Sequence, residues 1–346
     1  MEYCYISLYT DFTCLAGDCP ATCCAGWKIV VDAESVERFS RLENIRLRQD
    51  ILEHIRCQNS EYQFVNQPDG RCSMLDSDGL CRIQRNLDEK SLCNTCRKFP
   101  RLTANVGETI WMSMAASCPV VADYLWKNRI TWIKKDSPKR TTKLESGYFS
   151  VVKKGLELYQ SHYQILKKQS EEMSQLDQKQ KLLWHVRRKW HRFELFLDLV
   201  EGCLALMSEF PERPYLKGSF DYFEADEQTP AKIMKDMSSF EESWQKRFLD
   251  FAQNYLEYRT FSRYLEYQDE SEMQRYCQVI GEISLIYIIS FSRFMIFGSL
   301  SERQVIETIN WVYRFCAHGA VLSRKVTKMF CQIFQKTEDF LGVLMD

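Results

Sequence analysis

The sequence predicts a mainly α-helical protein, with a small, irregular α+β domain rich in cysteine followed by an all-α helical bundle. Two observations carry this prediction. Eleven of the fifteen cysteines fall within the first 118 residues, among short segments separated by turn-forming residues. After Pro230 there is no proline, and long stretches carry apolar residues at helical spacing. We place the boundary within Asp136–Ser146, which has linker composition, so the predicted domains are a metal- or iron–sulfur-binding domain at 1–135 and a helical domain at 136–346.

Short elements are expected in the first domain. Lys28–Val31 is a β-like run, and Asp32 is placed to cap the helix that follows, because aspartate accepts hydrogen bonds from the free amides of a first helical turn. Apolar residues near helical spacing extend this expected helix to about Cys57. Glu61–Val65 and Thr109–Met114 are the further strand candidates.

Pro119 suits the first position of a helix, where its missing amide hydrogen is no loss, and we expect that helix to continue through Trp132. Cys118 then lies at the helix N-terminus. The positive end of a helix dipole lowers the pKa of a thiol, so this position favours the thiolate that binds metals.

The second domain is expected to be a succession of helices. They are Tyr148–Glu172, Leu176–Ser208, Phe240–Gln268, Glu272–Ser299, Glu302–Ala317 and Val321–Leu344. The most apolar stretch, Ile283–Ser292, is only ten residues long, whereas a helix that crosses a bilayer needs about twenty. We therefore expect a buried core helix and no association with a membrane.

The clustered cysteines indicate metal binding in preference to disulfides. The first residues of the chain lack the basic segment, long apolar core and cleavage site of a secretory signal. We therefore expect a cytoplasmic protein, in whose reducing surroundings structural disulfides rarely persist. Clustered cysteines in such a protein are typical of metal sites or catalysis.

Charge is distributed unevenly along the chain, although the net charge is −1. The segment Lys127–Arg192 alone carries a net charge of +11. It is either a solvated helix face or a docking surface for an acidic protein partner. Nucleic acid is not expected as a partner, because no recognised nucleic-acid-binding module accompanies the charge.

Nine cysteines have the loop-like spacing of metal ligands: Cys14, Cys19, Cys23, Cys24, Cys72, Cys81, Cys93, Cys96 and Cys118. One tetrahedral zinc ion or one [4Fe–4S] cluster takes only four thiolates. The side chains of adjacent residues diverge, so Cys23 and Cys24 would bind different atoms of one cluster or two separate centres. Only Cys93–Cys96 has the spacing of a zinc knuckle, and Gly26 stands where the signature of radical enzymes needs a third cysteine.

The other cysteines and the histidines are expected to be packing or ordinary residues: Cys4, Cys57, Cys203, Cys277, Cys316, Cys331, His54, His162, His185, His191 and His318. The sequence contains neither a dinucleotide-binding glycine pattern nor a phosphate-binding loop. The residues by themselves therefore predict a metal-cluster domain followed by a helical domain.

Four stretches resemble the bacterial flagellin lysine-N-methylase family. They are Phe12–Asp32 (FTCLAGDCPATCCAGWKIVVD), Cys72–Gln84 (CSMLDSDGLCRIQ), Ser91–Arg101 (SLCNTCRKFPR) and Ser117–Pro119 (SCP). The stretches follow the family's order and lie within about residues 10–125. They belong to a broader class of zinc- or iron-chelating domains with a C-x-x-C-x-x-CC pattern, and the WKIVVD and FPR elements favour the methylase branch.

The resemblance implies an enzyme that moves a methyl group from S-adenosylmethionine to lysine ε-amines of flagellin, or of another acidic protein, with a [4Fe–4S] cluster or zinc in its place. The implied ligands are the cysteines that match the family's pattern: Cys14, Cys19, Cys23, Cys24, Cys72, Cys81, Cys96 and Cys118. Cys93 lies outside that pattern, and the helical domain would dock the substrate. The alternative is a non-catalytic zinc- or iron–sulfur-binding interaction module, or a redox sensor.

Four further residues are candidates within this interpretation. Arg101, in the FPR element, either contacts the cofactor's carboxylate or forms a structural salt bridge. Trp27 either lines the cofactor or lysine pocket or is a packed aromatic residue. Asp18 and Asp32 are candidate acceptors for the proton that the lysine loses, and Asp32 is also the expected helix cap.

Overall fold

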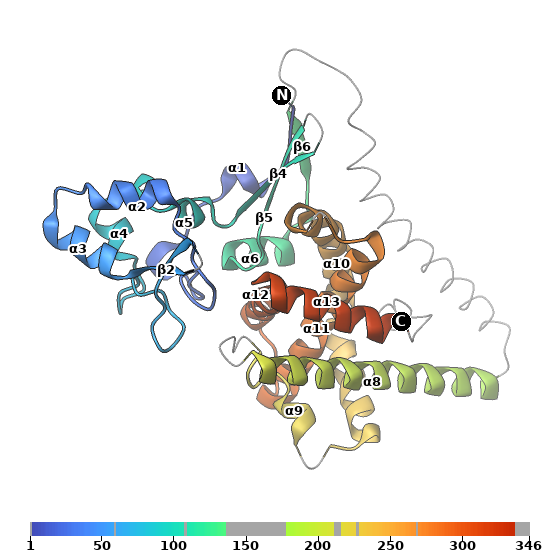
Figure 1. Ribbon diagram of the computed structural model, residues 1–346. Helices are drawn as coiled ribbons and strands as arrows, with labels where there is room; N and C mark the ends of the chain where they lie inside the picture. Colours follow the sequence, from blue (N-terminus) through green and yellow to red (C-terminus); the bar gives the residue numbers. More distant parts are fainter. Residues whose placement is uncertain are drawn as a thin grey trace.

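A computed structural model describes residues 2–58, 60–106, 109–135, 178–210, 216–225, 228–267 and 269–335. These residues form a cysteine-rich lobe, a small β-sheet and a helical bundle, so the described chain is mainly α-helical (Figure 1). The predicted linker Asp136–Ser146 and the predicted helix Tyr148–Glu172 lie outside the described residues.

The elements follow one another in this order: β1 (Glu2–Ile6), α1 (Leu8–Asp11), the 3-10 helix η1 (Ala16–Asp18), α2 (Ala33–Ser40), α3 (Ile45–Glu53), β2 (Ile55–Gln58), β3 (Glu61–Phe64), α4 (Arg82–Asn86), η2 (Glu89–Ser91), α5 (Asn94–Lys98), β4 (Arg101–Val106), β5 (Thr109–Met114), α6 (Pro119–Lys127), β6 (Trp132–Lys135), α8 (Gln178–Glu209), α9 (Asp221–Glu224), α10 (Pro230–Glu266), α11 (Glu272–Phe297), α12 (Glu302–Ala317) and α13 (Ala320–Gln335).

The cysteine-rich lobe contains the capped helix that the sequence predicts, in a shorter form. Asp32 caps α2, because its carboxylate accepts a hydrogen bond from the Ser35 amide at 3.0 Å. The single helix expected up to Cys57 is wrong: Asn44 caps a second helix, α3, and Cys57 lies in β2. The β-like run Lys28–Val31 forms only an isolated bridge to β3 and no strand.

A four-stranded sheet joins the lobe to the bundle, with strand order β4-β5-β1-β6. β1 runs parallel to β5 and antiparallel to β6, and β4 and β5 form a hairpin. The ring of Phe261 in α10 packs edge-on against Trp111 and Trp132, at centroid distances of 5.2 and 4.7 Å. These aromatic contacts attach the sheet to the bundle.

The helix that starts at Pro119 ends sooner than its sequence predicts. α6 stops at Lys127, and Trp132 begins strand β6. Asn254 of α10 donates from its amide to the carbonyl oxygens of Leu125 and Asn128, each at 2.8 Å. The last carbonyls of the helix are therefore satisfied by a side chain from another helix, and the chain turns away into the sheet.

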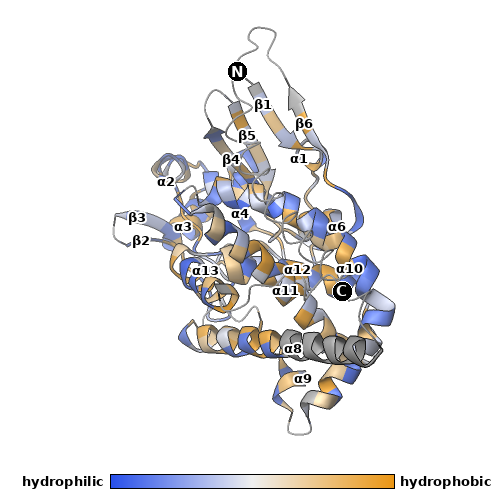
Figure 2. Ribbon diagram, turned by 90° about the vertical axis from the view of Figure 1, so that its right-hand side faces the viewer, coloured by the Kyte–Doolittle hydropathy of each residue, from blue (hydrophilic) through white to orange (hydrophobic). Residues whose placement is uncertain are grey.

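α11 is the core of the bundle and packs against α10, α12 and α13. Figure 2 shows its hydrophobic residues at the centre of the molecule. Within Met273–Phe297 the described residues contain one helix long and apolar enough to span a membrane, but 78% of its apolar window is buried inside the protein. This burial is that of a core helix, as predicted for Ile283–Ser292.

Local signals account for the helix starts in the bundle. Ser271 and Ser301 each form a capping box with the glutamine three residues later. α12 keeps its predicted bounds, whereas α10 begins at Pro230, ahead of the predicted Phe240, after the cap Thr229. α13 begins at Ala320, and the end of its predicted range lies outside the described residues.

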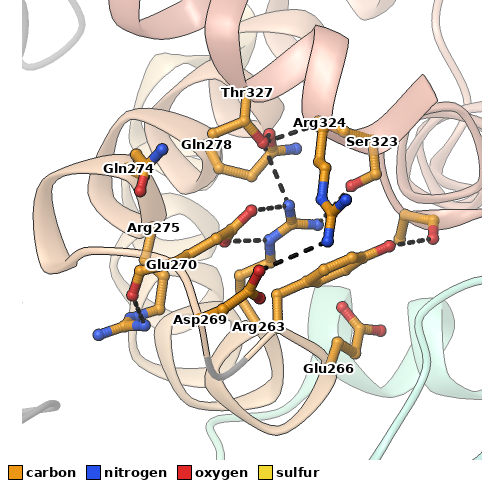
Figure 3. Close-up of polar contacts among 12 residues, drawn as sticks. Arg263, Glu266, Asp269, Glu270, Gln274, Arg275, Gln278, Ser323, Arg324 and Thr327 are labelled. Atoms are coloured by element: carbon orange, nitrogen blue, oxygen red, sulfur yellow. Dashed lines mark hydrogen bonds and ion pairs between the residues drawn. The ribbon is translucent and has the colours of Figure 1, made fainter. Parts of the chain in front are cut away.

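Two buried arginines of α10 form charge networks inside the bundle. Arg259 is fully buried and pairs with Glu282 at 2.8 Å and with Glu266 at 2.7 Å. Arg263 binds Glu270 through Nε at 2.8 Å, and Figure 3 shows its guanidinium group between α10, α11 and α13. Burial is tolerable for these ions because each has a partner of opposite charge and further hydrogen bonds.

Two large hydrophobic cores and one small cluster of Cys4, Trp111 and Phe261 are found among the described residues. One belongs to the lobe alone and is built from residues between positions 24 and 96. The other extends from β1 and α6 through the helices of the bundle, so residues 114–130 share a core with residues 195–333. The helices therefore pack directly against the segment that carries Cys118.

Candidate metal and cofactor site

Seven of the eight predicted ligand cysteines line one cavity of about 310 Å³, which residues between positions 12 and 120 enclose: Cys14, Cys19, Cys23, Cys24, Cys81, Cys96 and Cys118. The eighth, Cys72, lies behind the cavity wall, where its amide donates to the Cys24 carbonyl at 2.6 Å. Residues up to 104 positions apart in the sequence thus meet at one place.

The loop that carries the first four cysteines is shaped by local hydrogen bonds. The Ala16 amide donates to the Cys14 sulfur at 3.4 Å, within the turn that precedes η1. Trp27 Nε1 donates to the Cys23 carbonyl at 2.6 Å, and the amide of Gly26, which has a positive φ of 79°, donates to the Gly70 carbonyl at 2.9 Å. The loop is therefore folded back on itself and on the lobe.

Arg314 of α12 holds this loop against the segment before Cys118. Its Nη2 donates to the carbonyl oxygens of Ala21 at 3.1 Å, Thr22 at 2.9 Å and Ser117 at 3.2 Å. The arginine is buried, so these bonds are made out of contact with solvent. One side chain of the bundle thereby sets the position of the cysteine loop relative to the N-terminus of α6.

Two further side chains of the bundle support the same segment. The hydroxyl of Tyr258 donates to the Met114 carbonyl, and the amide of Asn310 donates to the Ala116 carbonyl at 3.2 Å. His318, just after α12, lies 5.5 Å from the Trp27 ring. Nothing in the sequence singles out these residues, because an arginine or asparagine on an amphipathic helix has no distinctive neighbours.

Burial and neighbouring thiols shift the cysteine pKa values in opposite directions. Burial raises the pKa of Cys72 to about 12 and that of Cys118 to about 11. The expectation for Cys118 is therefore wrong in sign: the α6 amides lower its pKa, but burial outweighs them. The hydrogen bond with Cys23 lowers the pKa of Cys24 to about 7, against its burial and with help from Thr22 and Arg314.

Cys93 belongs to the same group of thiols, although it lies outside the family's pattern. It is fully buried, and its sulfur donates to the Val30 carbonyl at 3.7 Å. A hydrogen bond with Cys96 lowers the pKa of Cys93 and raises that of Cys96. The two cysteines of the predicted knuckle thus already form a contacting pair.

The remaining candidates differ in how they face the cavity. Trp27 lines it and packs against Phe99 at 5.9 Å. Arg101 also lines it, lies over the rings of Tyr9 and Phe12, and makes no ion pair with any described side chain. Of its two alternatives, the salt bridge is thus not seen among the described residues.

Neither of the two candidate aspartates lines the cavity. Asp32 is already engaged by the amides of Ser35 and Asn94, which lower its pKa although burial acts to raise it. Asp18 is exposed on η1 and does not line the cavity. Glu89 does line it, at the start of η2, and sequence reasoning missed this residue.

The donors around the cavity are thiols, which suit either zinc or an iron–sulfur cluster. Four thiolates surround one zinc ion in a structural zinc site, whereas in an iron–sulfur cluster each thiolate binds its own iron. Among the described residues, no group of three or more histidine, cysteine, aspartate or glutamate side chains is already arranged around the position of a single ion.

Comparison with curated proteins finds relatives over part of the chain. The flagellar biosynthetic protein FliU of Salmonella muenchen is 33% identical over 117 residues, which cover 32% of this chain and 69% of FliU. Two proteins named lysine-N-methylase, from Salmonella choleraesuis and Salmonella typhimurium, are also 33% identical over 117 residues. That match spans only 29% of each lysine-N-methylase. No family model and no solved structure matches the sequence.

Proposed function

Because the chain belongs to the family of the flagellar biosynthetic protein FliU, we propose that it is a protein-lysine N-methyltransferase that uses S-adenosylmethionine and acts on flagellin. The convergence of seven cysteines, Trp27 and Arg101 on one cavity is the observation that carries this proposal. The name of the two relatives called lysine-N-methylase supports the reaction type, and the name of FliU supports a flagellar substrate.

A [4Fe–4S] cluster is the metal group that we propose for the cavity. Four of the seven cysteines that line it would hold the cluster, which when bound supplies an iron able to ligate the amino and carboxylate groups of the cofactor. This chemistry needs no nucleotide-binding loop, and the sequence has none. Zinc in place of the cluster is the alternative that metal analysis distinguishes.

The residues around the cavity have separate tasks in this reaction. Arg101 has no anionic partner among the described side chains and would bind the cofactor's carboxylate. Trp27 would cover the positively charged sulfonium with its ring, since aromatic faces attract cations. Both groups orient the methyl group for in-line displacement, in which positioning supplies most of the rate enhancement.

Methyl transfer also requires a neutral lysine. The ε-ammonium group first loses a proton, the free amine then attacks the methyl carbon, and the bond from that carbon to the sulfonium sulfur breaks. Glu89 is the acidic side chain among the residues that line the cavity, and we assign it as the proton acceptor in place of Asp18 and Asp32.

An acidic protein surface remains the proposed partner. Most of the basic segment Lys127–Arg192 lies outside the described residues, but Lys127 and Arg129 line a cavity of about 540 Å³ together with Lys246 and Arg247 of α10. Reversing the charge of the last two should weaken binding of flagellin in a sedimentation or interferometry assay. Unchanged affinity would remove this surface from the proposal.

The test of function starts with protein purified without oxygen. Iron, acid-labile sulfide and zinc are measured per chain, and methylation of flagellin lysines by S-adenosylmethionine is followed by mass spectrometry. About four irons, four sulfides and methylated lysine are expected. Cys19→Ser should abolish transfer, whereas Cys57→Ser, an exposed cysteine in β2, should leave it unchanged. Zinc without sulfide, and no transfer, would favour a non-catalytic binding module.

A further inference from the structure

The nine clustered cysteines separate into two groups by the cores in which they pack. The inner set consists of Cys24, Cys72, Cys81, Cys93 and Cys96, all of which belong to the hydrophobic core of the lobe or pack against it. The outer set consists of Cys14, Cys19, Cys23 and Cys118. None of the outer four is part of the lobe core, and Cys118 belongs to the core of the bundle.

Backbone contacts tie the inner set together within the lobe. The amide of Cys72 donates to the Cys24 carbonyl at 2.6 Å, and Leu75 forms a bridge with Cys81. Cys93 and Cys96 contact each other through their thiols. Electrostatic interactions link Cys72 and Cys81 with each other and both with Cys24 and Cys93.

The bundle, in contrast, assembles the outer set. Arg314 binds the carbonyls of Ala21 and Thr22, between Cys19 and Cys23, and the carbonyl of Ser117, next to Cys118. The thiol of Cys118 interacts electrostatically with those of Cys19 and Cys14, and the thiol of Cys23 with those of Cys14 and Cys118.

The two sets meet at the adjacent cysteines. The sulfurs of Cys23 and Cys24 are 4.0 Å apart, and electrostatic interactions also link Cys19 with Cys24 and Cys96 with Cys23. Because Cys24 packs against the core of the lobe and Cys23 does not, one of these adjacent cysteines is assigned to each set. Each set then contains at least four thiols, which is the number that one tetrahedral ion or one cubane cluster takes.

We propose that the chain binds two separate thiolate-held metal centres, one on the outer set and one on the inner set. The outer centre is the cofactor site of the proposed function, on which this inference rests for its chemistry. The inner centre is a closed, structural site for a thiophilic metal, Zn²⁺ or iron, because its ligands lie in a hydrophobic core. Cys93 supplies it with a fifth thiol.

Paired substitutions on the full chain test the separation. Cys14→Ser together with Cys19→Ser changes two accessible outer cysteines, Cys81→Ser together with Cys96→Ser changes two inner ones, and Cys57→Ser is the matched control outside both sets. The outer variant should lose one centre entirely and keep the metal of the other. The inner variant should lose the metal of the inner centre and keep that of the outer centre, and the control should keep both. Parallel loss of all metal in both variants would overturn the proposal.

A titration of the wild-type protein tests the proposal even if the variants misfold. Metal-free wild-type protein is titrated with Co²⁺ under anaerobic conditions, and thiolate-to-cobalt charge-transfer absorption is recorded. Two equivalents are expected at saturation, and a single equivalent would refute two centres. Two metals per chain without sulfide would support the separation while removing the cluster of the proposed function. One iron–sulfur centre and no second metal would overturn the two-centre proposal and keep the cluster of the proposed function.

Discussion

Replacing Arg314 with glutamine should detach the cysteine loop from the bundle. Nη2 of Arg314 carries two hydrogens and serves three carbonyl oxygens, those of Ala21, Thr22 and Ser117. A hydrogen bond to a charged group contributes about 1.5–3 kcal/mol, and two hydrogens limit the sum to about two such bonds. The side chain is buried, so solvent does not replace them. We expect the free energy of unfolding to fall by about 3 kcal/mol.

Urea unfolding of the metal-free protein, followed by circular dichroism, measures this loss. Arg324→Gln on α13 is the matched control, because Arg324 is 67% exposed and its ion pair with Asp269 is a surface contact at 3.4 Å. Such a pair contributes little, so the control should stay within about 0.5 kcal/mol of the unmodified protein. If Arg314→Gln is no less stable than the control, the clamp does not hold the loop.

The alkylation rate of Cys24 gives a second test, because a purely structural role of Arg314 would not change the pKa of this thiol. The positive charge of Arg314 is one cause of the lowered pKa of Cys24. Arg314→Gln should therefore raise that pKa and slow the alkylation of Cys24 at pH 7, whereas Arg314→Lys should recover the alkylation rate better than the stability. An unchanged rate in Arg314→Gln would contradict the electrostatic part of the reasoning.

Further predictions concern the thiols and the bundle. In metal-free protein, the alkylation rate of Cys24 should rise with pH, reach half its maximum near pH 7 and level off about one pH unit higher, because only the thiolate reacts and the pKa is about 7. Mass spectrometry of labelled peptides checks this, and a rise that continues beyond pH 9 would contradict it. Glu282→Gln removes the fully buried partner of a buried arginine and should cost about 3–5 kcal/mol in urea unfolding; a cost below about 1 kcal/mol would refute the charge network. Gly281→Ala should cost about 1–3 kcal/mol, because the new methyl group would lie 2.4 Å from the Phe330 ring, whereas Gly202→Ala meets a flexible methionine and should be near neutral. Equal thermal stability of these two variants would show that α11 and α13 do not pack so closely.

Local chemistry accounts for the parts of the fold that the sequence predicts well. Asp32 and Cys118 precede their helices as expected, because a capping side chain and a proline act on the nearest few residues. The capping box at Ser301 and the apolar periodicity after it give α12 its predicted bounds. The serial helices of the bundle follow from the same short-range rules.

Distant contacts account for the parts that sequence reasoning missed. α6 ends at Lys127 because Asn254, more than a hundred residues later, satisfies its last carbonyls. β1 pairs with β5 across a similar distance in the chain, which no local pattern indicates. The Asp32 carboxylate also accepts a hydrogen bond from the Asn94 amide of α5, sixty-two residues later, which the capping pattern does not indicate.

The candidate site divides in the same way. Cysteine content and spacing alone indicated a thiol-rich metal domain, because the number and type of ligands are properties of the residues themselves. The grouping of those thiols, the contact between the sulfurs of Cys23 and Cys24, and the hydrogen bonds from Arg314 to the cysteine loop came only with the tertiary structure. The reason is physical, because whether two side chains meet depends on how the lobe and the bundle pack. Arg314 and Ala21 are in contact although they are almost three hundred positions apart, and no local sequence pattern indicates such a contact.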